Sequence, residues 1–411
     1  MTRIAITGIG LVSPLGLDVP TYWRGLLEGR SGVSFIRAFP TDKLRSDVAA
    51  MVPDFDPSRW FDKKEQDIYG RVAQLSVAAA DEAVTQAKLG DVDKTRVGVI
   101  LSTGQGAVEI FEEQIRRSNE RGPRAVSPYF IPGVMLNAVS ALVSVKHRFM
   151  GPSFNVASAC ATASQSIALS ALMILAGEAD VMIAGGGEAA TRLNTVAGFG
   201  NARALARAFQ GDPARASRPY DVDRHGFVMG EGSGALVLET EDHARKRGAS
   251  PLAYLVGWGM SSDAEHLTRP HPDGLGLKLA IEAALRRAEI GPSDVGYINP
   301  HATSTPQGDV AEYLSMKQVF GEALRKIPIS ATKSMIGHLL GGAGAAEAIA
   351  VVCSLRDQVL HPSINVDRLD PVFEIDLVRE ARRADVRYAI SNSAGFGGHN
   401  CVLTFERALP A

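Results

Sequence analysis

The sequence predicts an α/β protein built from two similar halves, with two mostly parallel sheets and helices between and outside them. Short apolar runs, which are typical of buried strands, alternate along the chain with longer segments of helical composition. Four of the runs in the first part of the chain recur in the same order in the second part. We therefore expect a duplicated fold, with halves at residues 1–250 and 251–411 that meet in the polar stretch 240–251.

The first half begins with an apolar run at residues 4–10 that ends in Gly-x-Gly, which predicts a buried strand and a tight turn. A dinucleotide-binding loop is excluded here, because the third glycine is missing and Pro14 interrupts. Residues 35–67 contain three prolines and are expected to form an irregular surface excursion. The other predicted elements are helices at 22–28, 72–88, 109–119, 140–149 and 164–175, and strands at 96–102, 154–157, 180–184 and 234–239.

The second half repeats this series. Residues 252–259 repeat the first strand with its Gly-x-Gly, and residues 294–299 repeat 96–101. A strand at 327–330 and a small-residue helix at 343–355 repeat the strand and helix around Cys160. A strand at 388–391, followed by Gly395-x-Gly397-Gly398, repeats 180–187. The spacings differ between the halves, so insertions have occurred.

Composition excludes several classes of protein. The 411 residues are 45% hydrophobic and 21% charged, with a formal net charge of −2, so no global field favours nucleic acid. Three cysteines give no disulfide framework, which fits a reducing compartment, and a cytoplasmic location is expected. Glycines break the apolar N-terminal run, which we interpret as a strand and not as a signal peptide. Glu178 and Asp180 interrupt the longest apolar stretch, so no membrane partner is expected.

Cys160 occupies a predicted strand-to-helix turn among small residues. The first turn of a helix has unpaired N–H groups and a partial positive charge, which lower the pKa of a thiol placed there. Small neighbours would allow a bulky thioester to approach. The alternative is a buried cysteine that serves only as a small hydrophobic residue.

Three turns of the second half follow predicted strands and could face Cys160 across the pseudo-twofold axis. They lie at residues 299–306, 333–338 and 395–400, and they carry His301, His338 and a glycine-flanked Phe396. A cysteine with two histidines suggests thioester chemistry, in which the thiol holds an acyl group and neutral imidazoles hydrogen-bond a developing enolate. Each histidine alone could instead be structural. No pair of metal-binding residues has the short spacing of a zinc motif, so no metal is expected.

These motifs also carry a family resemblance. SACATA, PHATSTPQGD, TKSMIGHLLGGAG and SNSAGFGGHN occur in this order, and the chain resembles the elongating β-ketoacyl-[acyl carrier protein] synthases, of the synthase II type, over residues 2–406. The resemblance implies a thiolase-like fold, in which two βαβαβαββ halves form five αβαβα layers. It implies a decarboxylative Claisen condensation of a Cys-bound acyl group with malonyl-ACP, in fatty acid or type II polyketide synthesis. No cofactor is implied.

The resemblance also assigns roles to residues. Cys160 would be the acylated nucleophile, and His301 and His338 would act in malonyl decarboxylation, supported by the charged pair Lys333 and Glu347 and by Glu312. Backbone N–H groups of Cys160 and Phe396 would form the oxyanion hole, and Phe396 would gate the acyl pocket. The substrate-binding residues implied are Thr303 and Thr305 for the phosphopantetheine arm, with Ile110, Phe199 and Gly397 at the pocket.

The implied partner is an acyl carrier protein that carries acyl and malonyl groups on phosphopantetheine. A local basic patch would dock it, although any single charge is more often just solvated. The chain is expected to form a homodimer, or a heterodimer with a ketosynthase-like subunit, by pairing residues 153–156 across the interface. The candidate docking residues are Lys63, Lys64, Arg71, Arg124, Arg203 and Arg207.

Two alternatives remain open. A thiolase generally uses a second active-site cysteine, which the GFGGHN motif does not supply. A non-catalytic partner subunit of the chain-length-factor type usually lacks the nucleophile, whereas this chain keeps Cys160 and both histidines. The chain also departs from the common family pattern at Ala302, Ala394 and His399, and Ala394 removes bulk beside the gate.

Overall fold

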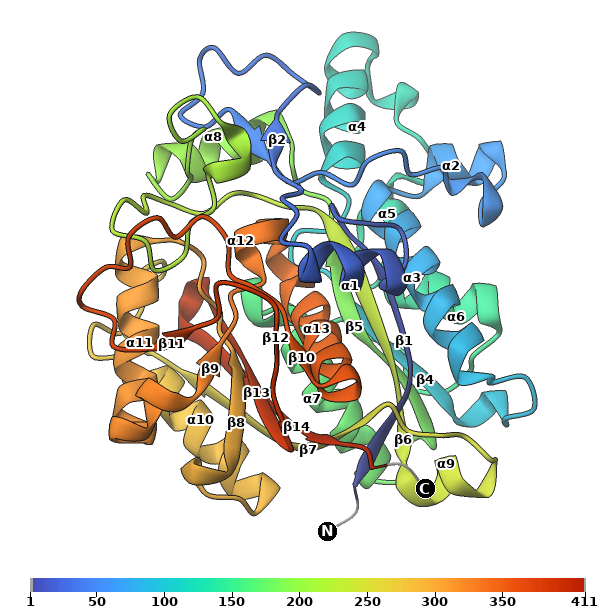
Figure 1. The fold of residues 1–411 in the computed structure, drawn as a ribbon. Helices are drawn as coiled ribbons and strands as arrows, with labels where there is room; N and C mark the ends of the chain where they lie inside the picture. The colour runs from blue at the N-terminus through green and yellow to red at the C-terminus, as the bar shows by residue number, and fades with distance from the viewer. Residues whose placement is uncertain (1–2, 410–411) are drawn as a thin grey trace.

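The computed structural model describes residues 3–409, and its fold is a duplicated α/β unit (Figure 1). Thr2, where the family resemblance begins, and the extreme ends of the two predicted halves lie outside the described residues. The first unit consists of β1 (Ile4–Val12), α3 (Arg71–Ala87), β4 (Val97–Ser102), α6 (Ala138–His147), α7 (Thr162–Leu175), β5 (Val181–Glu188) and β6 (Gly232–Thr240). The second consists of β7 (Ala253–Ser262), α10 (Leu275–Ala288), β8 (Val295–Asn299), α11 (Pro306–Phe320), β9 (Pro328–Ile329), α13 (Ala343–Asp357), β13 (Tyr388–Gly395) and β14 (His399–Arg407).

The two units share a single mixed sheet, which corrects the expectation of two mostly parallel sheets. The strand order is β11-β9-β8-β13-β14-β7-β1-β6-β5-β4, with β11 at Asp376–Leu377. In each unit the first strand and the last two are antiparallel neighbours, because β6 and β14 return beside β5 and β13. The units join where β1 and β7 pair over three residues, Ile4–Ile6 with Ala253–Leu255.

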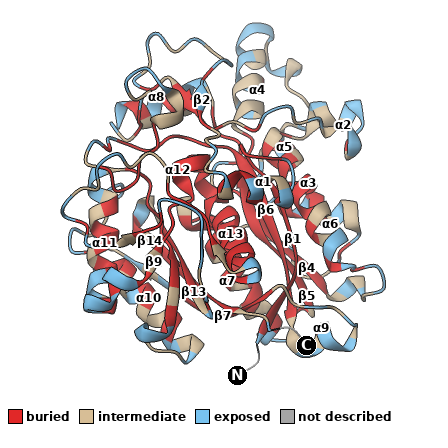
Figure 2. Ribbon diagram, in the orientation of Figure 1, coloured by how far each residue is buried: buried red, intermediate tan, exposed pale blue. Residues whose placement is uncertain are grey.

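The five expected layers are confirmed, because the strands of the two units pack on opposite sides of one helix layer although they belong to one continuous sheet. The helices α7 and α13 contact strands of both units and therefore form the central layer. The pair α3 and α6 covers the outer face of the first unit, and α10 covers that of the second, with α11 against it (Figure 1). The central helices and the strands on either side of them are the most deeply buried part of the molecule (Figure 2).

The repeated Gly-x-Gly lies inside a strand and does not form the turn that we expected. Both glycines of β1, Gly8 and Gly10, face α3 so closely that an added Cβ would lie 2.2 and 2.0 Å from helix carbonyl oxygens. Gly257 and Gly259 of β7 have the same relation to α10, at 2.3 and 2.0 Å. The motif is thus a helix-packing device repeated in both units, in agreement with the exclusion of a nucleotide-binding loop.

The predicted first-half helices are all present, within a few residues of the expected bounds. Residues 35–67 are largely irregular, as expected. The sequence did not single out α10, α11 or the helix at Leu193–Asn201, nor the helices of four to six residues among the remaining elements. The remaining elements are α1 (Val19–Leu27), β2 (Ser34–Phe35), β3 (Val48–Ala49), α2 (Lys63–Ile68), α4 (Val108–Arg121), α5 (Phe130–Val134), α8 (Leu193–Asn201), α9 (Glu241–Lys246), α12 (Lys333–Ile336), β10 (Val359–Leu360) and β12 (Arg382–Arg383).

The prediction of a buried strand at residues 154–157 is wrong for the single chain. Only Ser153 forms a bridge, to Val99 of β4, and residues 154–157 are partly or fully exposed. β4 is the edge strand of the sheet, so this segment has no partner on its outer side among the described residues. The pairing with β4 is limited to this one parallel bridge and does not extend into the ladder that would define a strand.

Candidate functional site

Cys160 lies in a strained turn at the N-terminal end of α7. The turn is a short 3-10 helix, η4 (Ala159–Ala161), and Ala159 adopts a left-handed φ of 50°. Such a conformation is unfavourable for a residue with a side chain and is retained where the surrounding structure enforces it. Gly395 at the end of β13 presses against this turn, because a Cβ there would lie 2.9 Å from Cys160 N. The second unit therefore directly contacts the backbone of the nucleophile turn.

The three second-half turns do face Cys160. One cavity of about 770 Å³ is lined by Cys160, His301, His338, Phe396 and Thr303, among others. Thr305, Phe199, Glu312 and Arg203 also line it. The residues reach this place because β8, β13 and the α12 turn end at the same edge of the sheet as β5.

The expectation of a lowered thiol pKa is wrong. Burial raises the pKa of Cys160 to about 12, although the Lys333 charge and the backbone N–H of Phe396, which donates to the sulfur, act in the opposite direction. The resting nucleophile is therefore a thiol, and its proton must leave as the sulfur attacks.

His301 is held as a neutral imidazole with a defined tautomer. Lys333 Nζ lies 3.4 Å from His301 Nδ1, and Lys333 also forms a hydrogen-bonded ion pair with Glu347. An ammonium group can only donate, so Nδ1 accepts and the proton of His301 resides on Nε2. Burial and the Lys333 charge lower the pKa of His301 well below its usual range. Burial raises the pKa of Glu347 to about 7, against the opposing charge of Lys333.

His338 presents both ring nitrogens without a hydrogen-bond partner among residues 3–409. Its backbone pairs with the segment around Met229, since His338 N–H donates to Val228 O at 2.7 Å. The ring stands edge-on to His301 with centroids 5.2 Å apart. Burial and then the Lys333 charge lower the pKa of His338 well below its usual range. A buried, neutral ring with open nitrogens on the cavity is suited to bind a substrate oxygen.

Glu312 of α11 positions the turn that carries His301. Its carboxylate accepts the backbone N–H of His301 at 2.7 Å and that of Ala302 at 2.8 Å, and Asn392 Nδ2 donates to it at 3.0 Å. This support accommodates the strained φ of 32° at Ala302. Further along the same turn, the hydroxyls of Thr303 and Thr305 lie 3.1 Å apart on the cavity wall.

Phe396 begins a glycine turn, and its ring belongs to a row of aromatic side chains. Its centroid lies 6.0 Å from that of Phe199, which lies 5.4 Å from Phe227, which in turn lies 5.4 Å from His338. The next two residues, Gly397 and Gly398, adopt φ values of 82° and 73°, which favour glycine. This row of rings connects the glycine turn at Phe396 with His338.

Several predicted site residues lie away from the cavity wall. Ile110 packs with the apolar cluster under α3, and Gly397 lies at the surface of its turn. Lys333 and Glu347 are buried behind the histidines, and they act on the cavity through His301.

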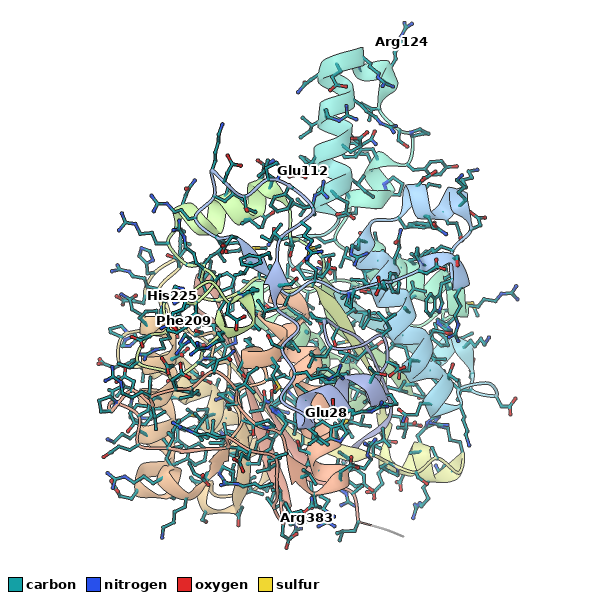
Figure 3. All side chains as sticks on the ribbon, turned by 45° about the horizontal axis from the view of Figure 1, so that its top comes forward. Glu28, Glu112, Arg124, Phe209, His225 and Arg383 are labelled. Carbon is teal, nitrogen blue, oxygen red and sulfur yellow. The ribbon has the colours of Figure 1, made fainter. Side chains whose placement is uncertain are left out.

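The docking candidates divide into three groups. Arg203 lines the cavity and Arg207 is exposed nearby, donating to Arg45 O at 2.6 Å. Lys63 and Lys64 are exposed on α2, and Arg124 projects from the far end of the α4 protrusion (Figure 3). Arg71 differs from these, because it forms an ion pair at 2.7 Å with Glu231, whose side chain is only 1% exposed. Arg71 is therefore committed to a structural contact.

Sequence reasoning missed three contributors to the cavity: Glu188, Phe227 and the loop at residues 263–274. Glu188 could have been noticed, because a carboxylate that directly follows Gly185–Gly187 at the end of a buried strand occupies the usual position of a site residue. No local signal marks Phe227, which reaches the cavity through tertiary packing. Within the described part of the chain no cluster of three or more potential metal ligands occurs, and no helix there has the length and hydropathy to cross a membrane.

Comparisons with known proteins agree with this geometry. Residues 1–244 match the family model described as "Beta-ketoacyl synthase, N-terminal domain", and residues 252–367 match the corresponding C-terminal domain. A 3-oxoacyl-[acyl-carrier-protein] synthase 2 of Vibrio harveyi is 43% identical over 409 residues, 98% of each chain.

Solved structures agree as well. The ishigamide ketosynthase/chain length factor superposes with a TM-score of 0.91 at 33% identity, covering 98% of this chain and 99% of the other. A type II polyketide ketosynthase in complex with its acyl-carrier protein superposes with a TM-score of 0.91 at 30% identity, with the same coverage.

Proposed function

The chain belongs to the β-ketoacyl synthase family and is an acyltransferase of the condensing type, and we propose that it elongates carrier-bound acyl chains by decarboxylative condensation with malonyl-ACP. The observation that carries the proposal is the meeting of Cys160, His301 and His338 at one cavity. The cavity volume of about 770 Å³ suits an acyl thioester together with the end of its phosphopantetheine arm.

In the first half-reaction, the Cys160 sulfur attacks the acyl thioester. The carbonyl oxygen becomes an oxyanion, which the backbone N–H groups of Cys160 and Phe396 would stabilise at the N-terminal end of α7. The thiol proton leaves with the carrier thiolate, which departs as a free thiol. The product is a thioester on Cys160.

In the second half-reaction, a malonyl thioester loses CO2 and its thioester oxygen gains negative charge. The Nε2–H of His301, fixed by Lys333 at Nδ1, and an N–H of His338 would donate to this oxygen. Each ring is neutral and so keeps one N–H, which it can donate to this oxygen. The resulting enolate carbon attacks the carbonyl carbon of the acyl group on Cys160. The carbon–carbon bond forms, and the Cys160 sulfur leaves as a thiolate.

Phe396 is proposed as the gate of the acyl pocket. Its backbone N–H faces the sulfur and its ring contacts Phe199, so a movement of the glycine turn would change both contacts together. The gate turn is tied to the loop at residues 263–274, because Gly397 N–H donates to Leu267 O at 2.7 Å. Ile110 and Gly397 would serve the acyl pocket only after this turn has moved.

The proposed carrier-docking surface contains exposed cations at the end of the molecule that carries the cavity mouth. Arg203 lines the cavity and Arg207 is exposed, and the helices α8, α2 and α4 lie along the same end of the molecule (Figure 1). Arg71 is left out of this surface because of its ion pair with Glu231. Acidic helices of a carrier protein would complement such a patch. The other members are Lys63, Lys64 and Arg124.

We further propose that residues 153–156 mediate dimerisation, with a second copy or a ketosynthase-like subunit. They flank the edge strand β4. Exposed apolar side chains nearby in the sequence are Val145 of α6, Met150 in the loop after α6 and Ile131 of α5, at 70%, 67% and 60% exposure. Unpaired sheet edges with apolar surroundings favour association. A monomer at micromolar concentration in sedimentation would contradict this.

The domain division at 1–250 and 251–411 is retained as a proposal, with the nucleophile in the first half and both histidines in the second. A cytoplasmic location is likewise proposed, in keeping with three free cysteines. The choice between fatty acid and polyketide synthesis stays open, because relatives of both kinds resemble the chain.

The direct test of the function is intact-protein mass spectrometry after incubation with acyl-ACP. An acyl adduct that maps to Cys160, followed by a β-ketoacyl product once malonyl-ACP is added, supports the proposal. A chain that forms no adduct and no product would instead be a non-catalytic partner subunit.

A further inference from the structure

A buried carboxylate on the cavity wall has no role in the two half-reactions. Glu188 is the last residue of β5 and is 1% exposed. Oε1 accepts from Thr103 Oγ1 at 2.6 Å and from Gln105 N–H at 3.2 Å. Oε2 accepts from Gly104 N–H at 3.1 Å and from Gly341 N–H at 3.2 Å. No cation pairs with Glu188 within residues 3–409, so this carboxylate is held by hydrogen bonds alone.

The fourth donor, Gly341, occupies the place of Cys160 in the second unit. The short helix η8 (Leu340–Gly342) leads into α13 as η4 leads into α7. Leu340 and Ala159 precede the equivalent positions with the same left-handed conformation, at φ 48° and 50°. The N–H of Gly341 is thus the counterpart of the Cys160 N–H that we assign to the oxyanion. In the second unit, a carboxylate oxygen of Glu188 takes the place of that oxyanion.

The same carboxylate connects the counterpart turn to the nucleophile turn. A Cβ at Gly104 would lie 3.0 Å from Glu188 Oε2 and 3.7 Å from Ala159 O, so Gly104 lies between the carboxylate and the Cys160 turn. The two turns η4 and η8 also contact each other directly. Moving the Glu188 carboxylate would therefore displace backbone that packs on Ala159.

We propose that Glu188 is a positioning residue, which occupies the vestigial oxyanion site of the second unit and through Gly104 and Gly341 holds the Cys160 turn in place. The inference rests on the proposed role of Cys160 as the acyl acceptor. It also gives Glu188 an electrostatic effect, because its negative charge disfavours the Cys160 thiolate.

The surrounding titratable groups define how this effect can be measured. Burial raises the pKa of Glu188 to about 7 against its four hydrogen bonds, so the carboxylate titrates near neutral pH. Lys333, Glu347, His301 and His338 also surround Cys160, and both histidines remain neutral in this range. The pKa of Glu347 is also about 7, and its charge opposes the Cys160 thiolate as well. The charge of Glu188 is therefore read as the part of the neutral inflection in the alkylation rate that Glu188→Gln removes.

The test compares Glu188→Gln with the wild type in two assays. Glutamine removes the charge and turns an NH2 group toward at least one backbone N–H donor, which should slow acyl transfer to Cys160 about tenfold. Iodoacetamide alkylation of Cys160 should become about threefold faster at mildly alkaline pH, because the opposing charge is gone. A purely structural loss would slow both reactions together. Unchanged acyl transfer, or unchanged or slower alkylation, would overturn the proposal.

The matched control is Glu239→Gln. Glu239 is also a buried carboxylate, bound by Thr7 and Arg247 at the opposite end of β6, and its change should leave both rates as in the wild type. If Glu188→Gln fails to fold, Thr103→Val removes one donor and should shift the neutral inflection of the alkylation profile upward; an unshifted inflection would overturn the proposal. A wild type that takes up no acyl group would refute the proposed function, whereas the alkylation assay would still test Glu188.

Discussion

Replacing Gly395 by alanine tests whether the second unit sets the position of the nucleophile. Gly395 has a φ of −130°, which any residue can adopt, so the effect of a methyl group is steric alone. The added Cβ would lie 2.9 Å from Cys160 N, 3.1 Å from Ser158 O and 3.3 Å from Ala161 N. All three are backbone atoms, so relief requires the Cys160 turn to move by about 0.5 Å, and such overpacking typically costs about 1–3 kcal/mol.

A shift of this size is small for the fold but large for the reaction. Misplacement of reacting groups by about 1 Å lowers rates about 100-fold, so Gly395→Ala should slow acylation of Cys160 about tenfold. The assay is single-turnover acylation followed by intact-protein mass, with thermal unfolding of the same sample. Gly90→Ala is the control, because no atom lies within 4 Å of a Cβ there. Wild-type acylation and an unchanged melting temperature in Gly395→Ala would refute this reasoning.

Three further predictions follow from the site. Phe396→Ala should impair acyl transfer more than malonyl decarboxylation, because the ring lies beside the nucleophile turn; equal losses would mean that Phe396 only supports the fold. Burial lowers the pKa of His338, so the unfolded chain binds a proton below about pH 6.5 that the folded chain does not, and stability falls as pH falls through that value. The decrease in melting temperature between about pH 7.5 and about pH 5.5 should therefore be smaller in His338→Ala; an equal decrease would contradict the assignment. Arg203→Glu combined with Arg207→Glu should slow acylation by acyl-ACP about tenfold at low salt and less at high salt, with a smaller loss for an acyl-pantetheine substrate, which meets Arg203 on the cavity wall but carries no acidic protein surface; a loss that does not depend on salt would contradict docking.

Local sequence patterns were sufficient to predict most of the repeated strands and the first-half helices, but not α10, α11 or the irregular course of residues 154–157. Apolar runs and helical periodicity reflect burial on one or both faces, and these are properties of short segments. The direction in which the strands pair, by contrast, is not a property of short segments. Whether β6 and β14 return antiparallel beside β5 and β13 depends on contacts between distant segments, which explains the wrong expectation of mostly parallel sheets.

The features of the site likewise divide into those that local motifs predict and those that depend on tertiary burial. The three second-half turns were found from their motifs and do line one cavity with Cys160. The pKa of Cys160 was predicted in the wrong direction, because the helix end is visible in the sequence whereas the burial that outweighs it is not. No local sequence pattern indicates that Arg71 pairs with the buried Glu231, which lies 160 positions away in the chain.

The central claim is that the two half-reactions depend on different residues of one cavity, and labelled CO2 release measured beside intact-protein mass tests it most directly. Cys160→Gln should form no acyl-enzyme and no condensation product, yet still release CO2 from malonyl-ACP, since decarboxylation needs no nucleophile. His338→Ala should lose CO2 release about 100-fold or more and keep at least some acylation of Cys160. Normal decarboxylation by His338→Ala, or condensation by Cys160→Gln, would contradict the account.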